Sequence, residues 1–173
     1  DWAIDRLSTS FGWIAEFPPP EISDGTSAIR APGSDEVCEV CCIADALDCA
    51  VLLAHHHGPE YWDLAERFYR NFLVESQVRD GSVFPQGSAG EESEHASFDD
   101  VPRRLVGVYA GWAAPNDVIN FNSRNKMRVF QSCCGAHGAF GLFTVWNNAL
   151  SLADRTVSVN VFIDRNTSFA TVV

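Results

Sequence analysis

Apolar residues recur at helical spacing along two consecutive stretches of the chain. Within residues 35–56 an apolar side chain returns at the spacing of a helical turn, and two opening carboxylates suit the positive N-terminal end of a helix. Residues 59–77 repeat the pattern and open with a proline, which a first helical turn tolerates. Because only residues 57 and 58 separate the two stretches, we expect an antiparallel pair of helices.

A third helix is predicted over residues 135–154, in "GAHGAFGLFTVWNNALSLAD". Its apolar residues recur at helical spacing in spite of the glycines. We expect Phe140, Phe143, either Val145 or Trp146, and Leu150 to lie on the face that points toward the core.

The apolar pattern changes after this third helix. The stretch "TVSVNVFID" alternates apolar and polar residues, which is typical of a strand, and "SFATVV" begins another. Residues 17–35 and 78–102 show no sustained period and are predicted to be loops. The sequence therefore predicts a mainly α chain, with a helical domain over residues 1–153 and the start of a β domain over residues 154–173.

The charge of the chain argues against two classes of partner. Twelve basic against 23 acidic residues give a net charge of −11, so a nucleic acid or an anionic membrane would be repelled. No stretch approaches the roughly 20 apolar residues that span a bilayer. We expect neither nucleic acid nor membrane as a partner. The chain lacks an initial Met and begins inside an amphipathic pattern, so we also expect it to be part of a larger protein.

Six cysteines fall into two groups. Four lie between Cys38 and Cys49, and the other two, Cys133 and Cys134, are adjacent. A disulfide framework does not fit this distribution, because adjacent cysteines rarely bridge each other and four lie within one helical stretch. The pattern favours thiols that are reduced or bound to metal, and reduced thiols favour a cytoplasmic location.

The adjacent cysteines have a partner segment in "DEVCEVCC". Cys133 and Cys134 come just before Gly135 and the third predicted helix, where a tight turn would let both face one ion. Glu36 and Cys38 share a side of the chain if the entry to their helix is extended. Together these residues make a tetrahedral set of one carboxylate and three thiolates, which suits Zn²⁺.

A second interpretation of the same cysteines stays open. Cys38 and Cys41 form a C-x-x-C pair that would give a four-cysteine zinc site with the later pair. Plain packing is the alternative for Cys41, and for Cys42 and Cys49, which lie on one helical face.

Taken in order, these motifs resemble one enzyme family. The E-x-C motif at Glu36 and Cys38 opens a helix, "CCG" opens another far downstream, and "VNVFIDRN" follows as strands. This order resembles the zinc-thiolate β-L-arabinofuranosidases of glycoside hydrolase family 127. The resemblance implies an (α/α)6 barrel followed by a β-sandwich, with later barrel helices in residues 1–153 and the first sandwich strands in residues 154–173. The rest of the barrel, or another chain that completes it, would be a partner, and a carbohydrate would be the substrate.

The resemblance also implies a role for each residue of the site. Glu36, Cys38, Cys133 and Cys134 would bind Zn²⁺, and Cys133 would attack the anomeric carbon of a furanoside or a related sugar. A metal keeps a thiol deprotonated at neutral pH, and the thiolate is the nucleophilic form. The implied function is that of a retaining glycoside hydrolase.

A retaining glycosidase needs a second group, a carboxylic acid that protonates the leaving oxygen and then activates water. Glu16, in "GWIAEF", is the candidate that the resemblance implies, and Glu21 is the second candidate. His137 follows the thiols closely enough to contact substrate, whereas His55, His56 and His57 suit a helix C-terminal end. Trp112 is expected at the rim of the site, as a platform for a sugar ring.

Two other functions remain open from the sequence. In the first, a closed zinc site has no catalytic role and only joins two helix starts. In the second, the chain belongs to another helical-barrel carbohydrate enzyme, such as an epimerase or a polysaccharide lyase, in which His and Tyr supply the acid–base pair without zinc.

Overall fold

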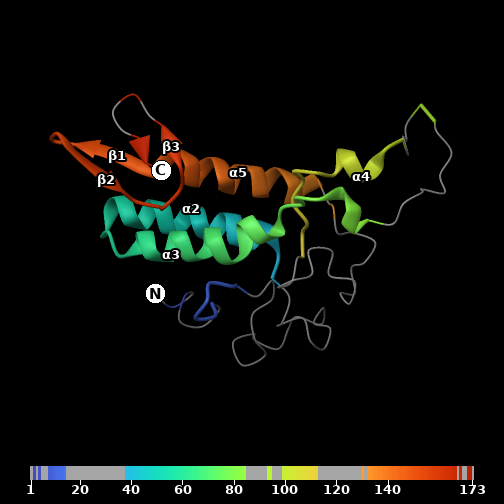
Figure 1. The fold of residues 1–173 in the computed structure, drawn as a ribbon. Helices are drawn as coiled ribbons and strands as arrows, with labels where there is room; N and C mark the ends of the chain where they lie inside the picture. The colour runs from blue at the N-terminus through green and yellow to red at the C-terminus, as the bar shows by residue number, and fades with distance from the viewer. Residues whose placement is uncertain are drawn as a thin grey trace.

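The chain is described here from a computed structural model. The described residues are 2, 4, 8–14, 38–84, 93–94, 99–112, 130, 132–166, 168 and 171–172. Helices dominate this part, and short antiparallel strands follow near its C-terminal end (Figure 1). The predicted mainly α fold is confirmed at this level, whereas the barrel and the β-sandwich stay predictions. Within the described part, none of the helices has the length and apolar character needed to cross a membrane.

Helix α2 (Val40–His56) forms the centre of the core. Its amide N–H at Val40 donates to the carbonyl of Gly111, 2.8 Å away, which satisfies one of the open donors at the helix start. The preceding Glu39 has extended backbone, and its carboxylate makes no capping hydrogen bond. That carboxylate is therefore available to other groups at this end of the helix. Six side chains form the buried face of α2: Val40, Ile43, Ala44, Leu47, Ala50 and Val51.

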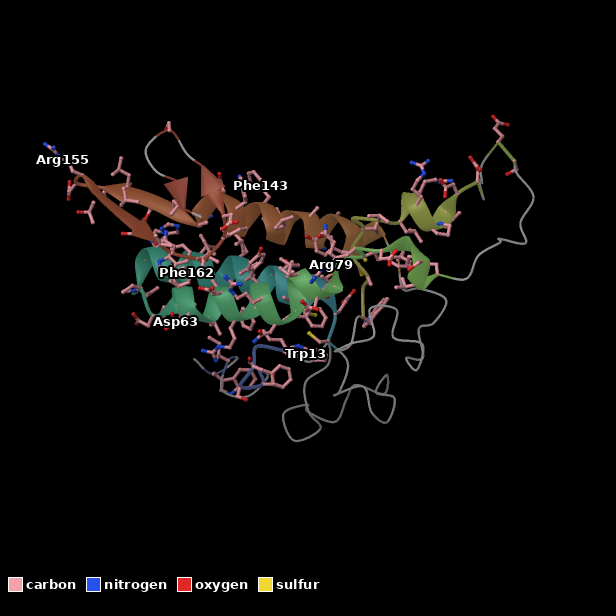
Figure 2. All side chains as sticks on the ribbon, viewed as in Figure 1. Trp13, Asp63, Arg79, Phe143, Arg155 and Phe162 are labelled. Carbon is pink, nitrogen blue, oxygen red and sulfur yellow. The ribbon has the colours of Figure 1, made fainter. Side chains whose placement is uncertain are left out.

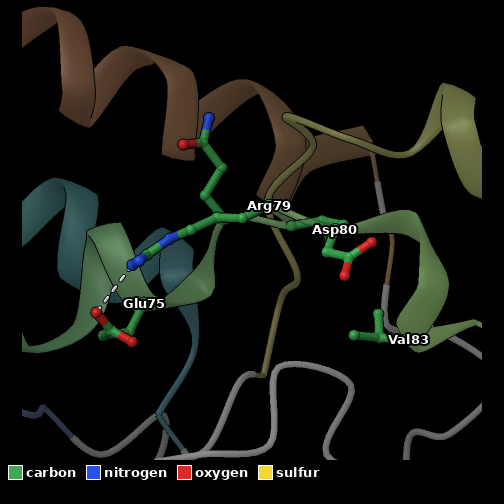
Figure 3. A pocket seen from close by; sticks show the side chains of 6 residues that line it. Glu75, Arg79, Asp80 and Val83 are labelled. Atoms are coloured by element: carbon green, nitrogen blue, oxygen red, sulfur yellow. Dashed lines mark hydrogen bonds and ion pairs between the residues drawn. The ribbon is translucent and has the colours of Figure 1, made fainter.

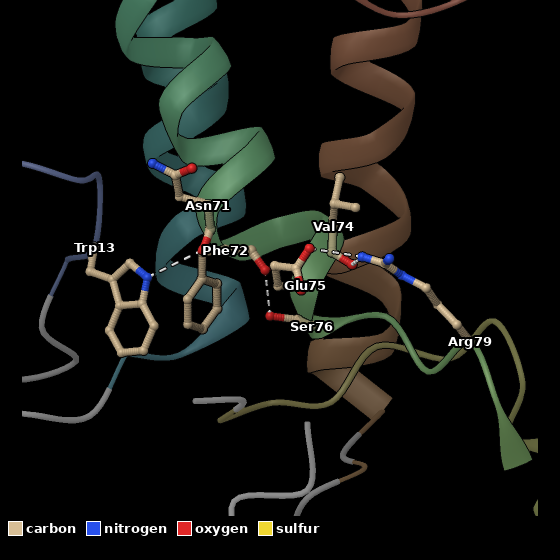
Figure 4. Close-up of polar contacts among 7 residues, drawn as sticks. All are labelled: Trp13, Asn71, Phe72, Val74, Glu75, Ser76 and Arg79. Atoms are coloured by element: carbon tan, nitrogen blue, oxygen red, sulfur yellow. Dashed lines mark hydrogen bonds and ion pairs between the residues drawn. The ribbon is translucent and has the colours of Figure 1, made fainter. Parts of the chain in front are cut away.

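Helix α3 (Tyr61–Phe68) packs against α2, and together they form the predicted helical hairpin (Figure 1). The sequence predicted one regular helix through residue 77, but the hydrogen bonding changes to a π-helical turn, η2 (Tyr69–Leu73), and then to a 3-10 turn, η3 (Val74–Ser76). At this change the buried Ser76 hydroxyl donates to the carbonyl of Phe72, 2.8 Å away (Figure 4). A local bond of this kind competes with the regular helical pattern.

Side chains on either side of these turns hold them in place. The indole N–H of Trp13 donates to the carbonyl of Asn71 at 3.4 Å (Figure 4). From the other side, Arg79 donates to the carbonyl of Val74 at 3.3 Å and to the carboxylate of Glu75 at 2.9 Å.

Helix α5 (Ser132–Asn148) lies directly against α2. Glycine allows this close approach, because a Cβ added at Gly141 would lie 3.3 Å from the Cβ of Ala44 and 3.0 Å from Cδ2 of Leu73. One turn earlier, a Cβ at Gly138 would overlap the ring of Tyr109. Two glycines that weaken the helix by themselves therefore fit it against its neighbours.

The strands begin earlier than predicted. Strand β1 (Leu150–Ala153) pairs with β2 (Thr156–Val159) in an antiparallel hairpin, and β3 (Arg165–Asn166) pairs in the same way with β4 (Thr171–Val172). The prediction that the third helix continues to residue 154 is therefore wrong, because α5 ends at Asn148. The reason is local: the two residues between β1 and β2 have positive φ, which is the backbone of a tight hairpin turn. The predicted start of this helix is wrong as well, because α5 begins at Ser132, so Cys133 and Cys134 lie in its first turn and not in a tight turn before it. The division into two domains stays a prediction.

Two predictions about large apolar side chains are also wrong. Phe140 and Phe143 were expected inside, but they are exposed on α5, and Figure 2 shows Phe143 on the side of α5 away from α3. Of the alternatives Val145 and Trp146, Val145 is buried and Trp146 is exposed, and the predicted burial of Leu150 is confirmed. Trp112 was expected at a rim, but it is 5% exposed.

Candidate metal centre

The N-terminal ends of α2 and α5 lie side by side. Cys41 Sγ at the start of α2 is 3.7 Å from Cys134 Sγ at the start of α5. At the other ends of the same helices, His55 Nε2 is 2.9 Å from Asn148 Oδ1. The two helices therefore run parallel along their whole length, and residues 93 positions apart in the chain meet at their starts.

Four metal-binding side chains gather at these helix starts: Glu39, Cys41, Cys133 and Cys134. One ligand atom from each lies within 4.8 Å of those of the other three, and we call the four residues the thiol cluster. Within it, Cys133 Sγ is 3.7 Å from Cys134 Sγ, and the Cys134 thiol donates to Glu39 Oε1 at 3.4 Å. Thiolate and carboxylate donors at such spacing could hold one metal ion.

The members of the thiol cluster differ in their access to solvent. Cys134 is completely buried, Glu39 and Cys41 are partly exposed, and Cys133 is exposed. An ion held here would therefore have a buried ligand on one side and an exposed thiol on the other. That arrangement makes Cys133 the most exposed of the three thiols, while Cys41 is partly accessible.

Burial sets the protonation of two of the thiols when no metal is bound. Burial, and then the negative charge of Glu39, raise the pKa of Cys41 to about 12. Burial is also the main reason that the pKa of Cys134 lies well above its ordinary value, and its hydrogen bond with Cys133 acts in the same direction. Without metal both thiols are neutral at pH 7. A bound cation would act in the opposite direction, because metal binding releases the protons of its thiol ligands.

Comparisons of the chain with protein-family models, curated proteins and solved structures found no match. The assignment of a metal to the thiol cluster therefore depends on the donor atoms and their geometry. The resemblance to family 127 supplies a hypothesis for what such a metal does.

The structure gathers a different E-x-C pair from the predicted one. Cys38 is 2% exposed, packs in the apolar core and is not a member of the thiol cluster. Glu36, its predicted partner, lies outside the described residues, as do the predicted acid Glu16 and its alternative Glu21. In place of the predicted pair, Glu39 and Cys41 lie beside Cys133 and Cys134.

The sequence contained a signal for this second pair. The letters "EVCEVC" repeat the E-x-C motif after three residues, so Glu39 and Cys41 have the same spacing as Glu36 and Cys38. The start of the helix decides between them. Because α2 begins at Val40, Cys38 precedes the helix and turns into the core, whereas Cys41 lies in the first turn against α5.

The remaining cysteines and histidines lie around this centre or away from it. Cys42 Sγ is 4.0 Å from the second carboxylate oxygen of Glu39. Cys49 is exposed, so the packing role predicted for Cys49 is wrong.

The predicted helix-end histidines, residues 55–57, are exposed at the end of α2. One turn beyond the cysteine pair, His137 Nε2 is 4.0 Å from Asp45 Oδ1, and its Nδ1 is buried without a hydrogen-bond partner among the described residues.

Two surface cavities lie elsewhere in the described part. One, of about 220 Å³, is lined by Glu75, Gln77, Val78, Arg79, Asp80 and Val83 (Figure 3). The other, of about 350 Å³, is lined by Asp63, Glu66, Arg67, Arg70 and Asn71. In each cavity an arginine pairs with the glutamate four residues before it, Arg79 with Glu75 and Arg70 with Glu66, so these charges already have partners. Neither cavity is lined by a residue of the thiol cluster.

Proposed function

We propose that the chain is part of a retaining glycoside hydrolase in which Zn²⁺ binds to Glu39, Cys41, Cys133 and Cys134. The spacing of the donors carries the proposal. Two thiolates at about 2.3 Å from a tetrahedral zinc ion lie about 3.8 Å apart, and a thiolate and a carboxylate oxygen lie about 3.5 Å apart. In the thiol cluster, the Cys134 sulfur is 3.7 Å from each of the other two sulfur atoms and 3.4 Å from Glu39 Oε1, and all four donor atoms lie within 4.8 Å of one another.

Bound zinc would keep the thiols deprotonated, which is the chemistry that a cysteine nucleophile needs. Cys133 is the thiol placed to react, because it is exposed while Cys134 is buried. Its thiolate would attack the anomeric carbon and form a thioglycoside as the bond to the leaving oxygen breaks. A carboxylic acid would protonate that oxygen and then remove a proton from the water that releases the sugar and restores the thiolate. Glu16 remains the proposed acid, with Glu21 as the alternative.

The arrangement of helices supports the proposed (α/α)6 barrel. Helices α2 and α5 run parallel and pack together, while α3 returns in the opposite direction beside α2. Parallel neighbours linked through antiparallel helices are what an α/α barrel requires. The strands after Asn148 would then begin the proposed β-sandwich.

A structural zinc site is the second candidate function. It is favoured by the number of protein ligands, because four protein donors fill a tetrahedral site and structural zinc sites are of this closed kind. The two candidates differ in what Cys133 does. In the enzyme it is a ligand and a nucleophile, whereas in the structural site it is a ligand only.

The experiment is a comparison of Cys133→Ser with Cys49→Ser in the full-length protein. Zinc content is measured by X-ray fluorescence, and turnover is measured on a panel of aryl furanosides and pyranosides. We expect Cys133→Ser to abolish turnover, because a serine hydroxyl is far less nucleophilic than a metal-bound thiolate. Cys49 is exposed and outside the cluster, so Cys49→Ser should keep full turnover. Zinc without turnover on any substrate would favour the structural site, and full turnover by Cys133→Ser would exclude the covalent mechanism.

A further inference from the structure

We propose that Cys41 and Cys134 are also a site of oxidative modification, in which a disulfide bond between α2 and α5 forms in place of the metal. Both cysteines belong to the proposed zinc site, so the competition with metal rests on that part of the proposed function. The disulfide itself requires no glycosidase activity. The proposed glycoside hydrolysis neither forms nor breaks the Cys41–Cys134 disulfide.

The two sulfur atoms are already near bonding range. They are 3.7 Å apart, so each needs to move by less than about 1 Å to reach the roughly 2.05 Å of a disulfide. A disulfide also requires the two backbones to be close, with Cα atoms no more than about 6.8 Å apart. The helices approach closely a little further along, where a Cβ added at Gly141 would lie 3.3 Å from the Cβ of Ala44.

The alternatives within the cluster are less suitable. Cys133 and Cys134 are also 3.7 Å apart, but they are adjacent residues inside α5. A disulfide between neighbours would distort the peptide that joins them and break the first turn of the helix. Cys38 lies outside the thiol cluster. The Cys41–Cys134 bond joins two helices and leaves both of them intact.

The chemistry balances with hydrogen peroxide as the oxidant. The sulfur of Cys41 is partly exposed, and the small fraction that is thiolate attacks one peroxide oxygen, which yields a sulfenic acid and one water molecule. This first step is therefore faster at alkaline pH. The buried sulfur of Cys134 then attacks the sulfenic sulfur, and a second water molecule leaves as the disulfide forms. The two thiol protons end in the two water molecules. A dithiol reductant reverses the change.

Metal and disulfide exclude each other, because both need the same two sulfur atoms. Zinc would engage Cys41 and Cys134 as thiolates, whereas the disulfide has no thiolate left to offer. Oxidation of the metal-free protein would leave the exposed Cys133 sulfur outside the disulfide. After loss of the metal and formation of the disulfide, the thiol cluster could no longer bind metal through Cys41 and Cys134. The exposed Cys133 thiol would still be present.

The test uses the full-length protein, reduced, with and without bound zinc, and treated with a small excess of hydrogen peroxide. Peptide mass mapping without reduction, with the bonded sulfur atoms assigned by fragmentation of the joined peptides, should find Cys41 bonded to Cys134 in the metal-free sample, and alkylation should still modify Cys133. Zinc-loaded protein should form at least tenfold less of this product in the same time. Cys41→Ser and Cys134→Ser should abolish the joined peptides, while Cys49→Ser should not.

Each result of this test decides the proposal. A bond that fragmentation assigns to the sulfur of Cys133, or free thiols throughout in the wild-type sample, would overturn it whatever the variants do. Equal yields of the Cys41–Cys134 disulfide with and without zinc would show that bound metal does not prevent the disulfide. If the protein binds no zinc but still joins Cys41 to Cys134, the proposed function fails while the disulfide stands, so the two failures are distinguishable.

Discussion

The residue at which α2 begins decides which of two E-x-C motifs faces α5. The motifs are Glu36 with Cys38 and, three residues later, Glu39 with Cys41. Cys133 and Cys134 could be singled out from the sequence, because adjacent cysteines before a glycine are unusual, and the structure places both in the thiol cluster. Their partners Glu39 and Cys41 were not chosen, because the repeat "EVCEVC" fits the motif twice. Only the position of the first helical turn separates the two registers, and helix starts are the least certain feature of a periodic pattern.

The two registers predict opposite results for two similar variants. Cys41→Ser should weaken zinc binding by more than about 100-fold, since even the outer partners of metal ligands contribute 10- to 100-fold. Cys38→Ser should keep zinc and lower the free energy of unfolding by about 1–3 kcal/mol, because it places a hydroxyl in the apolar core. Zinc affinity is measured by competition with a chelator, and unfolding by urea titration. Loss of zinc by Cys38→Ser alone would restore the first register.

Alkaline pH should destabilise the metal-free protein through Cys41. Burial and the Glu39 carboxylate raise the pKa of this thiol from 9.0 to about 12 in the folded state. Between about pH 9 and pH 12 the unfolded chain therefore binds fewer protons than the folded protein, so stability falls as the pH rises. We expect the free energy of unfolding, measured with a chelator present, to decrease above about pH 9. Cys41→Ser should make that decrease smaller, and an unchanged slope would contradict this cause.

At the scale of single elements, the sequence predicted where helices occur better than which way they face. The α2–α3 hairpin follows from two clear helical periods. Helix α5 is different, because its 17 residues contain no acidic residue, lysine or arginine. An apolar pattern on all sides cannot tell which face packs on α2, so Phe140 and Phe143 were placed inside although they are exposed. The end of α5 was missed because the alternation of β1 is only four residues long.

The glycines of α5 provide a test of how this helix is packed. A Cβ at Gly138 would overlap the ring of Tyr109, whereas a Cβ at Gly135 would meet nothing within 4 Å. Gly138→Ala should therefore lower the free energy of unfolding by about 1–3 kcal/mol, as overpacking does. Gly135→Ala should raise it by up to about 1 kcal/mol, because alanine is the better helix former. Urea titration of both variants is the measurement, and equal effects would show that Tyr109 does not pack on α5.

At the scale of the whole molecule, the recurrence of apolar residues over several stretches predicted the helical class, and the residue counts give the acidic character directly. The meeting of α2 and α5 could not be predicted in this way, since it joins positions 93 residues apart. Such a contact is set by the packing of the entire core. The net charge of −11 also matters here, because an acidic protein attracts divalent cations in general. A metal effect at the thiol cluster must therefore be separated from this general attraction.

Zinc should stabilise the whole fold by joining the starts of α2 and α5. An ion that binds only the folded state adds about 2.7 kcal/mol to the free energy of unfolding when its free concentration is 100-fold above Kd. We expect a gain of that order for the metal-free protein in a zinc buffer, together with slower hydrogen exchange at the first turns of both helices. Mg²⁺ at the same concentration should give little gain, because it prefers oxygen ligands, and Cys41→Ser should remove most of the zinc effect. If zinc and Mg²⁺ stabilise the protein equally, the ions act through its acidic surface, and the thiol cluster is not a metal centre.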